Sequence, residues 1–133
     1  MKIRPLENKD IDQVVKLWIN SFSDRYDQAI NHNHISDTKS TTLVSVENKT
    51  VTGVASLYVI EKLTRKLGLI EDVAVNEKFR GKGIGKRLVR KLIEIAAAKN
   101  CDKTVLNSSE DNLEFYNKLG FDKNEIQMII RKK

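Results

Sequence analysis

Residues 69–86 read LIEDVAVNEKFRGKGIGK, and this stretch decides the fold. Its first half is apolar and β-prone around the acidic pair Glu71 and Asp72, which is typical of a strand. A glycine-rich turn follows, and from Ile84 apolar residues recur every three or four positions, which predicts a helix of about four turns. A strand that leads through a turn directly into a long helix indicates an α/β domain.

The glycine-rich turn has the character of a pyrophosphate site. Gly81, Gly83 and Gly85 alternate with other residues, so the backbone can approach phosphate oxygens without obstruction by side chains. The following helix directs its free N–H groups and its positive dipole end toward the same place. The glycine spacing fits neither the nucleotide-triphosphate loop nor the dinucleotide-binding fingerprint.

Outward from this turn, periodicity and turn residues divide the chain into strands and helices. The predicted elements are a strand at residues 1–4, a helix from an N-cap at Asn8 to Phe22, a short helix at Asp24–Ile30, a hairpin of strands Thr42–Glu47 and Val51–Ile60 around Asn48-Lys49, a strand at Gly68–Val75, a helix from Ile84 to about Asn100, a strand at Lys103–Asn107, a helix from Ser109 or Glu110 to Gly120, and a last strand at Phe121 and Glu125–Arg131. The strand-helix-strand order around the long helix requires parallel pairing.

Composition predicts one globular domain, residues 1–133, with 40% hydrophobic and 32% charged residues. The lone Cys101 cannot form a disulfide within the chain, which favours a reducing compartment, and we expect a cytoplasmic protein. The first residues carry charges where a signal peptide is apolar, and no apolar run approaches the roughly 18 residues of a membrane span. We therefore expect no membrane partner.

The net charge of +6 is concentrated in one region. Between Lys78 and Lys103 there are nine basic and two acidic residues, which indicates a local attraction for an anionic ligand. Aromatic residues are only 6% and no RNA-binding aromatic motif is present, so a nucleic-acid partner is disfavoured. His32 and His34 have no cysteine or third histidine nearby, and we expect no metal site.

Two motifs resemble the GCN5-related N-acetyltransferase (GNAT) superfamily. The first is RGKGIG at residues 80–85, and the second is NLEFYNKLGF at residues 112–121. The region from about Gly53 to Arg131 is similar to glucosamine-6-phosphate N-acetyltransferases. The resemblance implies a GNAT-type acyltransferase fold, with a mixed central sheet of six to seven strands flanked by about four helices.

The resemblance also implies acetyl-CoA as the co-substrate and direct attack by an amine in a ternary complex, without an acyl-enzyme. A backbone amide near Val73 would polarise the acetyl carbonyl. The residues implied to bind the coenzyme are Val73, Ala74, Val75, Arg80, Gly81, Lys82, Gly83, Ile84, Gly85, Lys86, Asn107, Asn112, Tyr116 and Lys118.

For the chemistry, the resemblance implies that Tyr116 protonates the departing thiolate. An ordinary tyrosine pKa near 10 lies above that of a thiol, about 8.5, so the hydroxyl remains a donor at neutral pH. Glu71 is the favoured general base, directly or through water, with Asp72 or water as alternatives. Adjacent strand residues point to opposite faces, so only one of the two carboxylates is expected at the acceptor unless a bulge redirects the other.

The amine acceptor is left open by the sequence. A small polar amine is expected, such as an amino sugar phosphate, an amino acid or a polyamine, and residues 23–40 are expected to shape its pocket. Asn107 stands where the amino-sugar-phosphate enzymes carry a carboxylate, which puts that particular acceptor in doubt. A protein or peptide acetyltransferase, a non-catalytic CoA-binding module and a nucleic-acid-binding module remain alternatives, and a homodimer is implied only by analogy.

Overall fold

The computed structural model describes residues 1–132, whose strands form one mixed sheet in the order β1-β2-β3-β4-β5. The strands are β1 (Lys2–Pro5), β2 (Ser40–Glu47), β3 (Thr50–Glu61), β4 (Lys66–Val75) and β5 (Lys103–Leu106). The first four strands pair antiparallel, and β4 pairs parallel with β5. The predicted parallel crossover is therefore confirmed.

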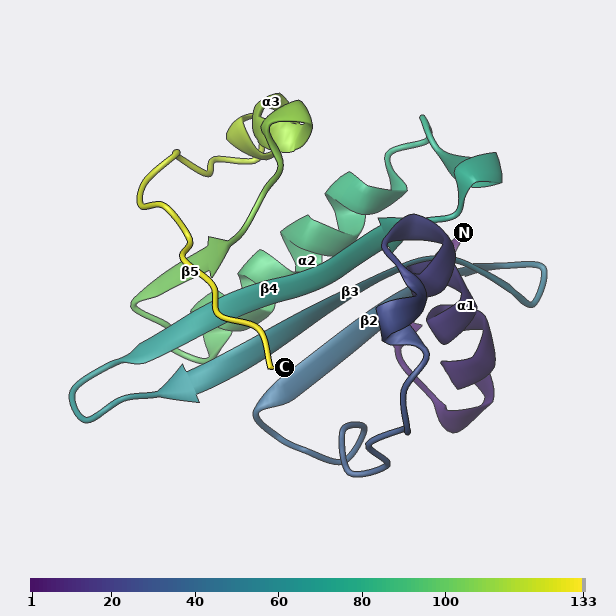
Figure 1. The fold of residues 1–133 in the computed structure, drawn as a ribbon, viewed down its shortest axis with the longest axis horizontal. Helices are drawn as coiled ribbons and strands as arrows, with labels where there is room; N and C mark the ends of the chain where they lie inside the picture. Colours follow the sequence, from purple (N-terminus) through teal and green to yellow (C-terminus); the bar gives the residue numbers. More distant parts are fainter. Residues whose placement is uncertain (133) are drawn as a thin grey trace.

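Two long helices cover the sheet (Figure 1). They are α1 (Ile11–Ser21) and α2 (Ile84–Ala98), and a short helix α3 (Leu113–Asn117) follows β5. Single 3-10 turns lie at η1 (Asn8–Asp10), η2 (Asp24–Tyr26), η3 (Glu77–Phe79) and η4 (Glu110–Asn112). Because α2 is the crossover between β4 and β5, its N-terminus lies beside the end of β4, next to the glycine-rich turn.

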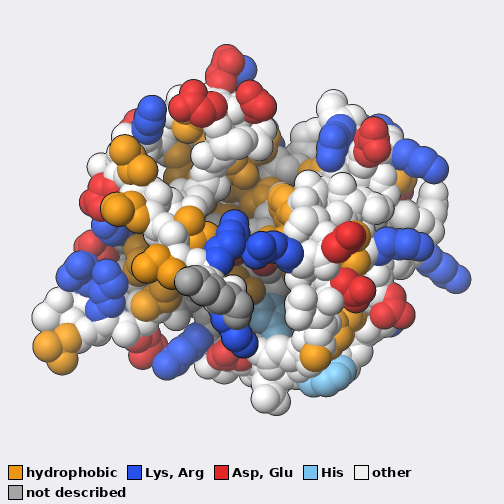
Figure 2. All heavy atoms as spheres, in the orientation of Figure 1, with side chains coloured by type: hydrophobic (Ala, Val, Ile, Leu, Met, Phe, Trp, Pro, Cys, Tyr) orange, Lys and Arg blue, Asp and Glu red, His pale blue; other side chains and the backbone are white. Residues whose placement is uncertain are grey.

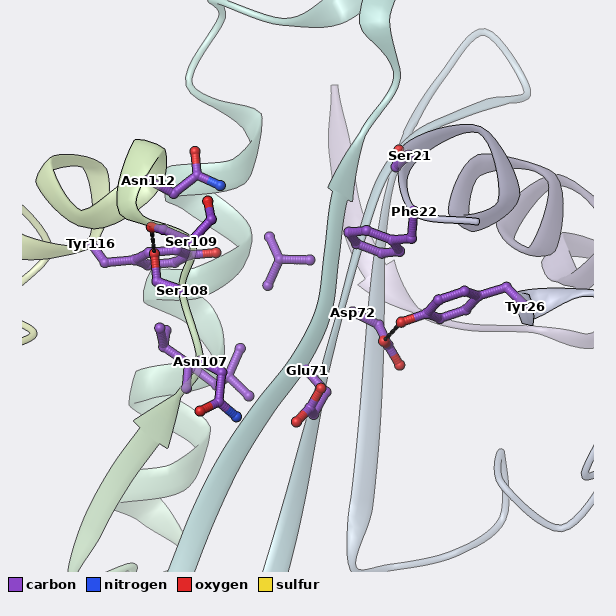
Figure 3. Close-up of a pocket in the computed structure, with 13 residues that line it drawn as sticks. Ser21, Phe22, Tyr26, Glu71, Asp72, Asn107, Ser108, Ser109, Asn112 and Tyr116 are labelled. Atoms are coloured by element: carbon purple, nitrogen blue, oxygen red, sulfur yellow. Dashed lines mark hydrogen bonds between the residues drawn. The ribbon is translucent and has the colours of Figure 1, made fainter. Parts of the chain in front are cut away.

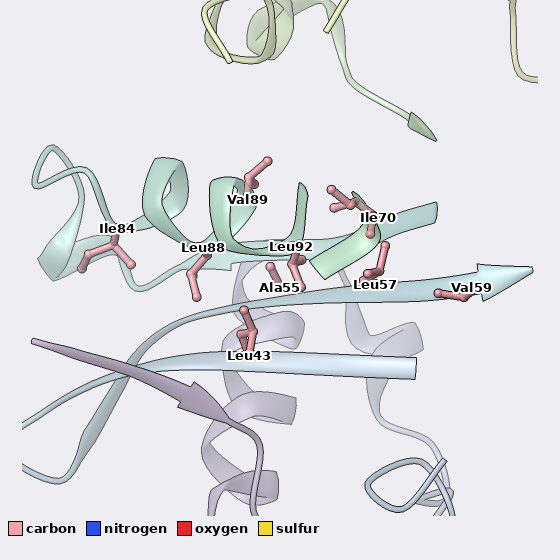
Figure 4. Packing of buried hydrophobic residues seen from close by; sticks show 10 residues of the cluster. Leu43, Ala55, Leu57, Val59, Ile70, Ile84, Leu88, Val89 and Leu92 are labelled. Atoms are coloured by element: carbon pink, nitrogen blue, oxygen red, sulfur yellow. The ribbon is translucent and has the colours of Figure 1, made fainter. Parts of the chain in front are cut away.

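The larger part of the core lies between α2 and the sheet (Figure 4). Leu88, Leu92 and Ala96, at helical spacing, are fully buried against Leu57 and Ile70 of the central strands. Burial of each of these leucine and isoleucine side chains stabilises the fold by roughly 1.5–3 kcal/mol. This packing fixes where α2 begins, and therefore where the backbone N–H groups of its first turn lie.

A second apolar cluster lies between α1 and the sheet. Val14 and Leu17 pack against Val44, Val54 and Ala74, which alternate along the strands with residues of the first cluster. The alternation along strands places the two clusters on opposite faces of the sheet. The end of α1 is thereby held against β4, which matters for the site described below.

The predicted hairpin between β2 and β3 is confirmed. Asn48 and Lys49 form its two-residue turn with φ of 49° and 66°. Two consecutive residues with positive φ are the geometry that matches the twist of paired strands, and Asn tolerates it better than most residues.

The expected sheet of six to seven strands and about four helices is wrong in number. Within residues 1–132 the sheet has five strands and there are three α-helices. The predicted last strand at Phe121 and Glu125–Arg131 is not formed, since residues 121–132 lie in no helix or strand. A strand needs a backbone partner, and none of the chain's own strands pairs with this segment.

Several element boundaries also differ from the prediction. Asn8 begins η1, and Glu7 takes the N-cap position in a capping box with Asp10. The predicted helix at Asp24–Ile30 is reduced to η2. The predicted helix that ends at Gly120 is shorter, because α3 ends at Asn117, although Gly120 does have a positive φ of 103°.

A β-bulge interrupts β4 at the acidic pair. Ala74 pairs with Val54 and Glu71 pairs with Ser56, so Asp72 and Val73 together face the single residue Ala55. Asp72 has φ of 58°, in the left-handed region that a side-chain-bearing residue in a strand rarely adopts. The bulge reverses the alternation of side chains at this point, and it lies at the edge of the main cavities.

No helix within residues 1–132 combines the length and the apolar character needed to cross a membrane.

Candidate active site

The site lies where β4 and β5 separate. Their parallel pairing stops at Ile70 and Leu106, so the residues of β4 after Ile70 have no partner in β5. The surface is hollowed between the part of the molecule that carries α3 and the part that carries α1 (Figure 2). Two cavities occupy this region.

The first cavity has a volume of about 400 Å³, and both polar and apolar side chains line it (Figure 3). It is lined by Ser21, Phe22, Tyr26, Ile70, Glu71, Asp72, Val73, Leu106, Asn107, Ser108, Ser109, Asn112 and Tyr116. Its charged lining residues are the two carboxylates of β4, which favour a cationic or hydroxylated ligand. The size suits a small metabolite.

Both carboxylates line this cavity, because the bulge turns Asp72 toward the same space as Glu71. Two hydrogen bonds from the end of α1 and from η2 hold Asp72 in place. The indole Nε1 of Trp18 donates to the backbone carbonyl of Asp72 at 2.9 Å, and the hydroxyl of Tyr26 donates to its Oδ1 at 2.8 Å. The expectation that a bulge is needed to bring both residues to one site is met.

The electrostatics of the cavity favour a proton acceptor at Glu71. Burial raises the pKa of Glu71, and the neighbouring charge of Asp72 raises it further. A carboxylate with a raised pKa is a stronger base and is better matched to proton transfer near neutral pH. Burial also raises the pKa of Tyr26, with a further contribution from its hydrogen bond to Asp72, so its hydroxyl stays protonated.

The second cavity, about 560 Å³, runs along the end of β4 and the N-terminus of α2. It is lined by Ser21, Phe22, Val73, Ala74, Val75, Phe79, Arg80, Gly81, Gly83, Ile84, Gly85, Lys86, Asn112, Phe115 and Tyr116. Gly81 and Gly83 have φ of 80° and 79°, and a Cβ added at either would meet nothing within 4 Å. The turn is therefore open toward the cavity, as a cradle for phosphate oxygens requires.

The two cavities meet at Tyr116, which lines both. Its ring makes edge-to-face contacts with Phe115 at 4.9 Å and with Phe121 at 6.0 Å between centroids. These contacts fix the ring plane, and burial raises the pKa of the hydroxyl. The Tyr116 ring is therefore held in place, with a protonated hydroxyl, where the acidic cavity meets the cavity that the glycine turn lines.

Most of the residues predicted to bind a coenzyme line the second cavity, and three do not. Asn107 lines the first cavity instead. The Nζ of Lys82 lies 5.2 Å from the centre of the Phe79 ring. Lys118 is exposed, and its Nζ lies 3.5 Å from Oε1 of Glu114. Neither lysine lines a cavity described here.

Several lining residues were not predicted individually from the sequence. Ser21, Phe22 and Tyr26 come from the end of α1 and the segment after it, and Trp18 acts through the Asp72 backbone. Of these, only Tyr26 falls in residues 23–40, the segment expected from the sequence to shape the acceptor pocket. No motif marks these residues, because their role depends on the packing of α1 against β4.

A comparison with protein-family models matches residues 10–121 to the acetyltransferase (GNAT) family. The chain belongs to this family. Two of the curated relatives that match part of this chain are glucosamine 6-phosphate N-acetyltransferases. The protein from Trypanosoma brucei brucei is 48% identical over 81 residues, covering 59% of this chain and 55% of its own length.

The protein from Dictyostelium discoideum is 38% identical over 90 residues, covering 65% of this chain and 57% of its own length. The chain thus spans little more than half the length of these curated relatives. Solved GNAT structures match over almost the whole chain. An acetyltransferase of Trypanosoma brucei is 32% identical with a TM-score of 0.86, and the alignment covers 98% of this chain and 99% of that one.

The glucosamine-6-phosphate N-acetyltransferase of Arabidopsis thaliana is 28% identical with a TM-score of 0.87, covering 99% of this chain and 98% of that one. The similarity of fold therefore extends beyond the 59% and 65% of this chain that the alignments with the two curated relatives cover. The structural likeness includes α1 and the segment after it, which line the first cavity.

Proposed function

We propose that this protein is an acetyl-CoA-dependent N-acetyltransferase that acts on the primary amine of a small polar acceptor. The observation that carries the proposal is the meeting of two cavities at Tyr116. One of them is lined by the two carboxylates of β4, and the other by the open glycine turn at the start of α2. In a direct transfer, the two substrates must be bound together with their reacting atoms in contact.

The second cavity fits the coenzyme. Backbone N–H groups around Gly81 and Gly83 would hold the diphosphate, with Arg80 and Lys86 adding positive charge. The end of β4, which has no partner in β5, presents free backbone groups at residues 73–75 to the extended arm of the coenzyme. When bound, acetyl-CoA supplies a thioester whose carbonyl carbon is open to attack and whose sulfur leaves as a thiolate.

Glu71 takes the proton that the acceptor ammonium must lose before its nitrogen can attack the carbonyl carbon. Its raised pKa supports this role, since a carboxylate of ordinary acidity is a poor base for an amine. The new carbon–nitrogen bond forms as the carbon–sulfur bond breaks. A backbone amide near Val73 polarises the acetyl oxygen, a kind of interaction worth about 3 kcal/mol of barrier lowering.

Tyr116 then gives its proton to the departing sulfur, and the second proton that the nitrogen sheds as the amide forms returns the Tyr116 phenolate to its hydroxyl. The hydroxyl lies at the junction of the two cavities and burial keeps it protonated at neutral pH. Its contacts with Phe115 and Phe121 hold the ring, so the proton is delivered from a fixed direction.

Within the class of small polar amines, we propose an amino sugar as the acceptor, and glucosamine 6-phosphate first. Two curated relatives carry that activity in their names. The first cavity offers hydroxyl and amide groups at Asn107, Ser108, Ser109 and Asn112, which suit the hydroxyls of a sugar. Asn107 binds or orients a ligand group there, since a neutral amide accepts no proton.

The test is release of coenzyme A thiol when the purified protein is mixed with acetyl-CoA and glucosamine 6-phosphate. A panel of glucosamine, amino acids and polyamines defines the acceptor class. We expect amine-dependent thiol release with an amino sugar. Tight binding of acetyl-CoA without thiol release on any amine would show a coenzyme-binding module instead of an enzyme.

A further inference from the structure

We propose that Tyr26 is a positioning residue for the amine acceptor. Its hydroxyl fixes the carboxylate of Asp72 in the first cavity, where that carboxylate binds the ammonium group of the acceptor. This inference rests on the proposed function, because it assigns the amine to a definite part of the same site. It also separates the tasks of two adjacent carboxylates: Asp72 binds the ammonium and Glu71 accepts the proton.

The geometry begins with the backbone of Asp72. Its φ of 58° turns the side chain into the cavity, out of the direction that a regular strand would give it. Such a conformation costs of order 1–3 kcal/mol and persists only when surrounding groups hold it. Trp18 holds the backbone through its 2.9 Å bond to the carbonyl, and Tyr26 holds the side chain through its 2.8 Å bond to Oδ1 (Figure 3).

Tyr26 is itself held by aromatic neighbours. Its ring lies 5.8 Å from Trp18 and 5.1 Å from Phe22 between centroids, at interplanar angles of 47° and 37°. Trp18 lies in α1 and Phe22 directly follows it, and α1 packs on the sheet. These two neighbours therefore fix the direction in which the hydroxyl of Tyr26, in η2, points. One aromatic cluster of Trp18, Phe22 and Tyr26 thus holds Asp72 through two hydrogen bonds, one to its backbone carbonyl and one to Oδ1.

The hydrogen bond leaves capacity for a ligand. A carboxylate has two oxygens that accept hydrogen bonds, and Tyr26 occupies Oδ1. Oδ2 remains to accept from an ammonium group, and the adjacent Glu71 lines the same cavity. The raised pKa of Tyr26 keeps its hydroxyl protonated at neutral pH. The hydroxyl therefore remains a hydrogen-bond donor to Asp72 and takes no proton from the ammonium group of the acceptor.

The experiment measures amine binding by calorimetry in the presence of saturating coenzyme A, with glucosamine 6-phosphate as the probe. Three variants are compared with the wild type: Tyr26→Phe, Asp72→Asn and the double variant. Tyr26→Phe keeps the ring and its aromatic contacts and removes only the hydroxyl. We expect about tenfold weaker binding of the probe by Tyr26→Phe, since a hydrogen bond to a charged group is lost.

Non-additivity is the signature of positioning. If Tyr26 acts through Asp72, the double variant binds the amine no more weakly than Asp72→Asn alone. Glucose 6-phosphate, which lacks the amine, is the ligand control, and its affinity is expected to stay the same in all variants. Thr104→Val is the residue control, because it also removes one hydroxyl but lies on β5 outside both cavities, and it should leave amine affinity unchanged.

Equal amine affinity in the wild type and Tyr26→Phe would overturn the inference. So would multiplicative losses in the double variant, or a wild type that binds glucosamine 6-phosphate no better than glucose 6-phosphate. Thiol release, measured separately, tests the proposed function. If the variants show the expected affinities but the wild type releases no thiol, the amine site is supported and the proposed enzymatic activity is rejected. If the wild type releases thiol but the variants bind the amine as tightly as the wild type, the activity is supported and the role of Tyr26 is rejected.

Discussion

Glu71 and Asp72 are consecutive residues of β4, and their side chains line the same cavity. In a regular strand they would point to opposite faces of the sheet. The bulge opposite Ala55 and the left-handed backbone of Asp72 bring them together. Each carboxylate consequently affects the other, and the charge of Asp72 contributes to the raised pKa of Glu71.

The first prediction concerns the pH dependence of turnover. A base must be deprotonated to act, so kcat at saturating substrates should fall as pH falls through the raised pKa of Glu71. Asp72→Asn removes a negative neighbour, which lowers the pKa of Glu71 and moves this acidic limb to lower pH. Glu71→Gln should lower kcat by about a hundredfold or more and remove the limb. An acidic limb at the same pH in Asp72→Asn would contradict the coupling.

The second prediction concerns Tyr116. Tyr116→Phe preserves the edge-to-face contacts and removes the proton donor, so we expect kcat to fall by about a hundredfold. The dissociation constant for coenzyme A, measured by calorimetry, should change less than threefold, an expectation set by the retained ring area. If kcat stays near the wild-type value, Tyr116 is a packing residue and protonation of sulfur comes from elsewhere.

The third prediction uses two glycines with left-handed backbones. Gly83 and Gly120 have φ of 79° and 103°, and an added Cβ would meet no atom within 4 Å at either. Alanine at each position should therefore cost a similar amount of stability, about 1–2 kcal/mol. Only Gly83 lines the second cavity.

We expect Gly83→Ala to weaken coenzyme A binding by about tenfold or more, because its new methyl group and any relaxation of the turn lie where the diphosphate binds. Gly120→Ala is the matched control for strain. Calorimetric affinities that fall equally in both variants would assign the loss to general destabilisation.

The fourth prediction concerns stability. Asp10 is buried and accepts two hydrogen bonds from Arg4 at 2.7 and 2.9 Å, which join β1 to the start of α1. Asp10→Asn removes the buried carboxylate partner of Arg4, which keeps only the exposed Glu7 at 2.8 Å, and should lower the free energy of unfolding by about 2 kcal/mol at pH 7. Glu114→Gln, at an exposed ion pair, should change it by less than about 0.5 kcal/mol.

The pH dependence of this loss has a defined sign. The hydrogen bond from Arg4 holds the pKa of Asp10 below its ordinary value, and the positive charges of Arg4 and Lys9 lower it further. The folded state therefore gains stability from Asp10 above the pKa that the group has when unfolded, and loses it as pH falls through the lowered value. Denaturant unfolding at a series of pH values should show the difference between wild type and Asp10→Asn shrinking in acid. A difference that is constant down to low pH would contradict this assignment.

The fifth prediction concerns self-association. The segment after α3 has the alternating pattern of a strand but pairs with no strand within residues 1–132. Its apolar side chains are exposed to solvent: Ile126, Met128 and Ile130 are 88%, 93% and 99% exposed. β5 pairs only with β4, so its other edge is free in the described chain. We expect a homodimer in which this segment contacts the second copy, since long apolar segments are rarely left in water.

Light scattering should give twice the chain mass for the wild type and the chain mass for the triple variant Ile126→Ser, Met128→Ser and Ile130→Ser. Leu63→Ser, which removes a fully exposed apolar residue from the turn between β3 and β4, is the control and should stay dimeric. A monomeric wild type would reject the homodimer.

The sequence by itself determined the elements whose signal is local. The apolar period from Ile84 predicts α2, the β-prone run before it predicts β4, and the alternating glycines predict the open turn between them. These patterns act over a few residues, because helix and strand periodicity is a property of neighbouring positions. The second family motif likewise marked Tyr116, within a helix predicted from Ser109 or Glu110 to Gly120.

Only the tertiary structure decided how the acidic pair is presented and which residues hold it. The bulge at Asp72 depends on the register of β3 against β4, and Tyr26 reaches Asp72 across 46 positions of sequence because α1 packs on the sheet. The last predicted strand is absent for the same reason. The backbone hydrogen bonds of a strand go to a neighbouring strand. The sequence of one segment does not determine whether the edge of another strand lies within reach.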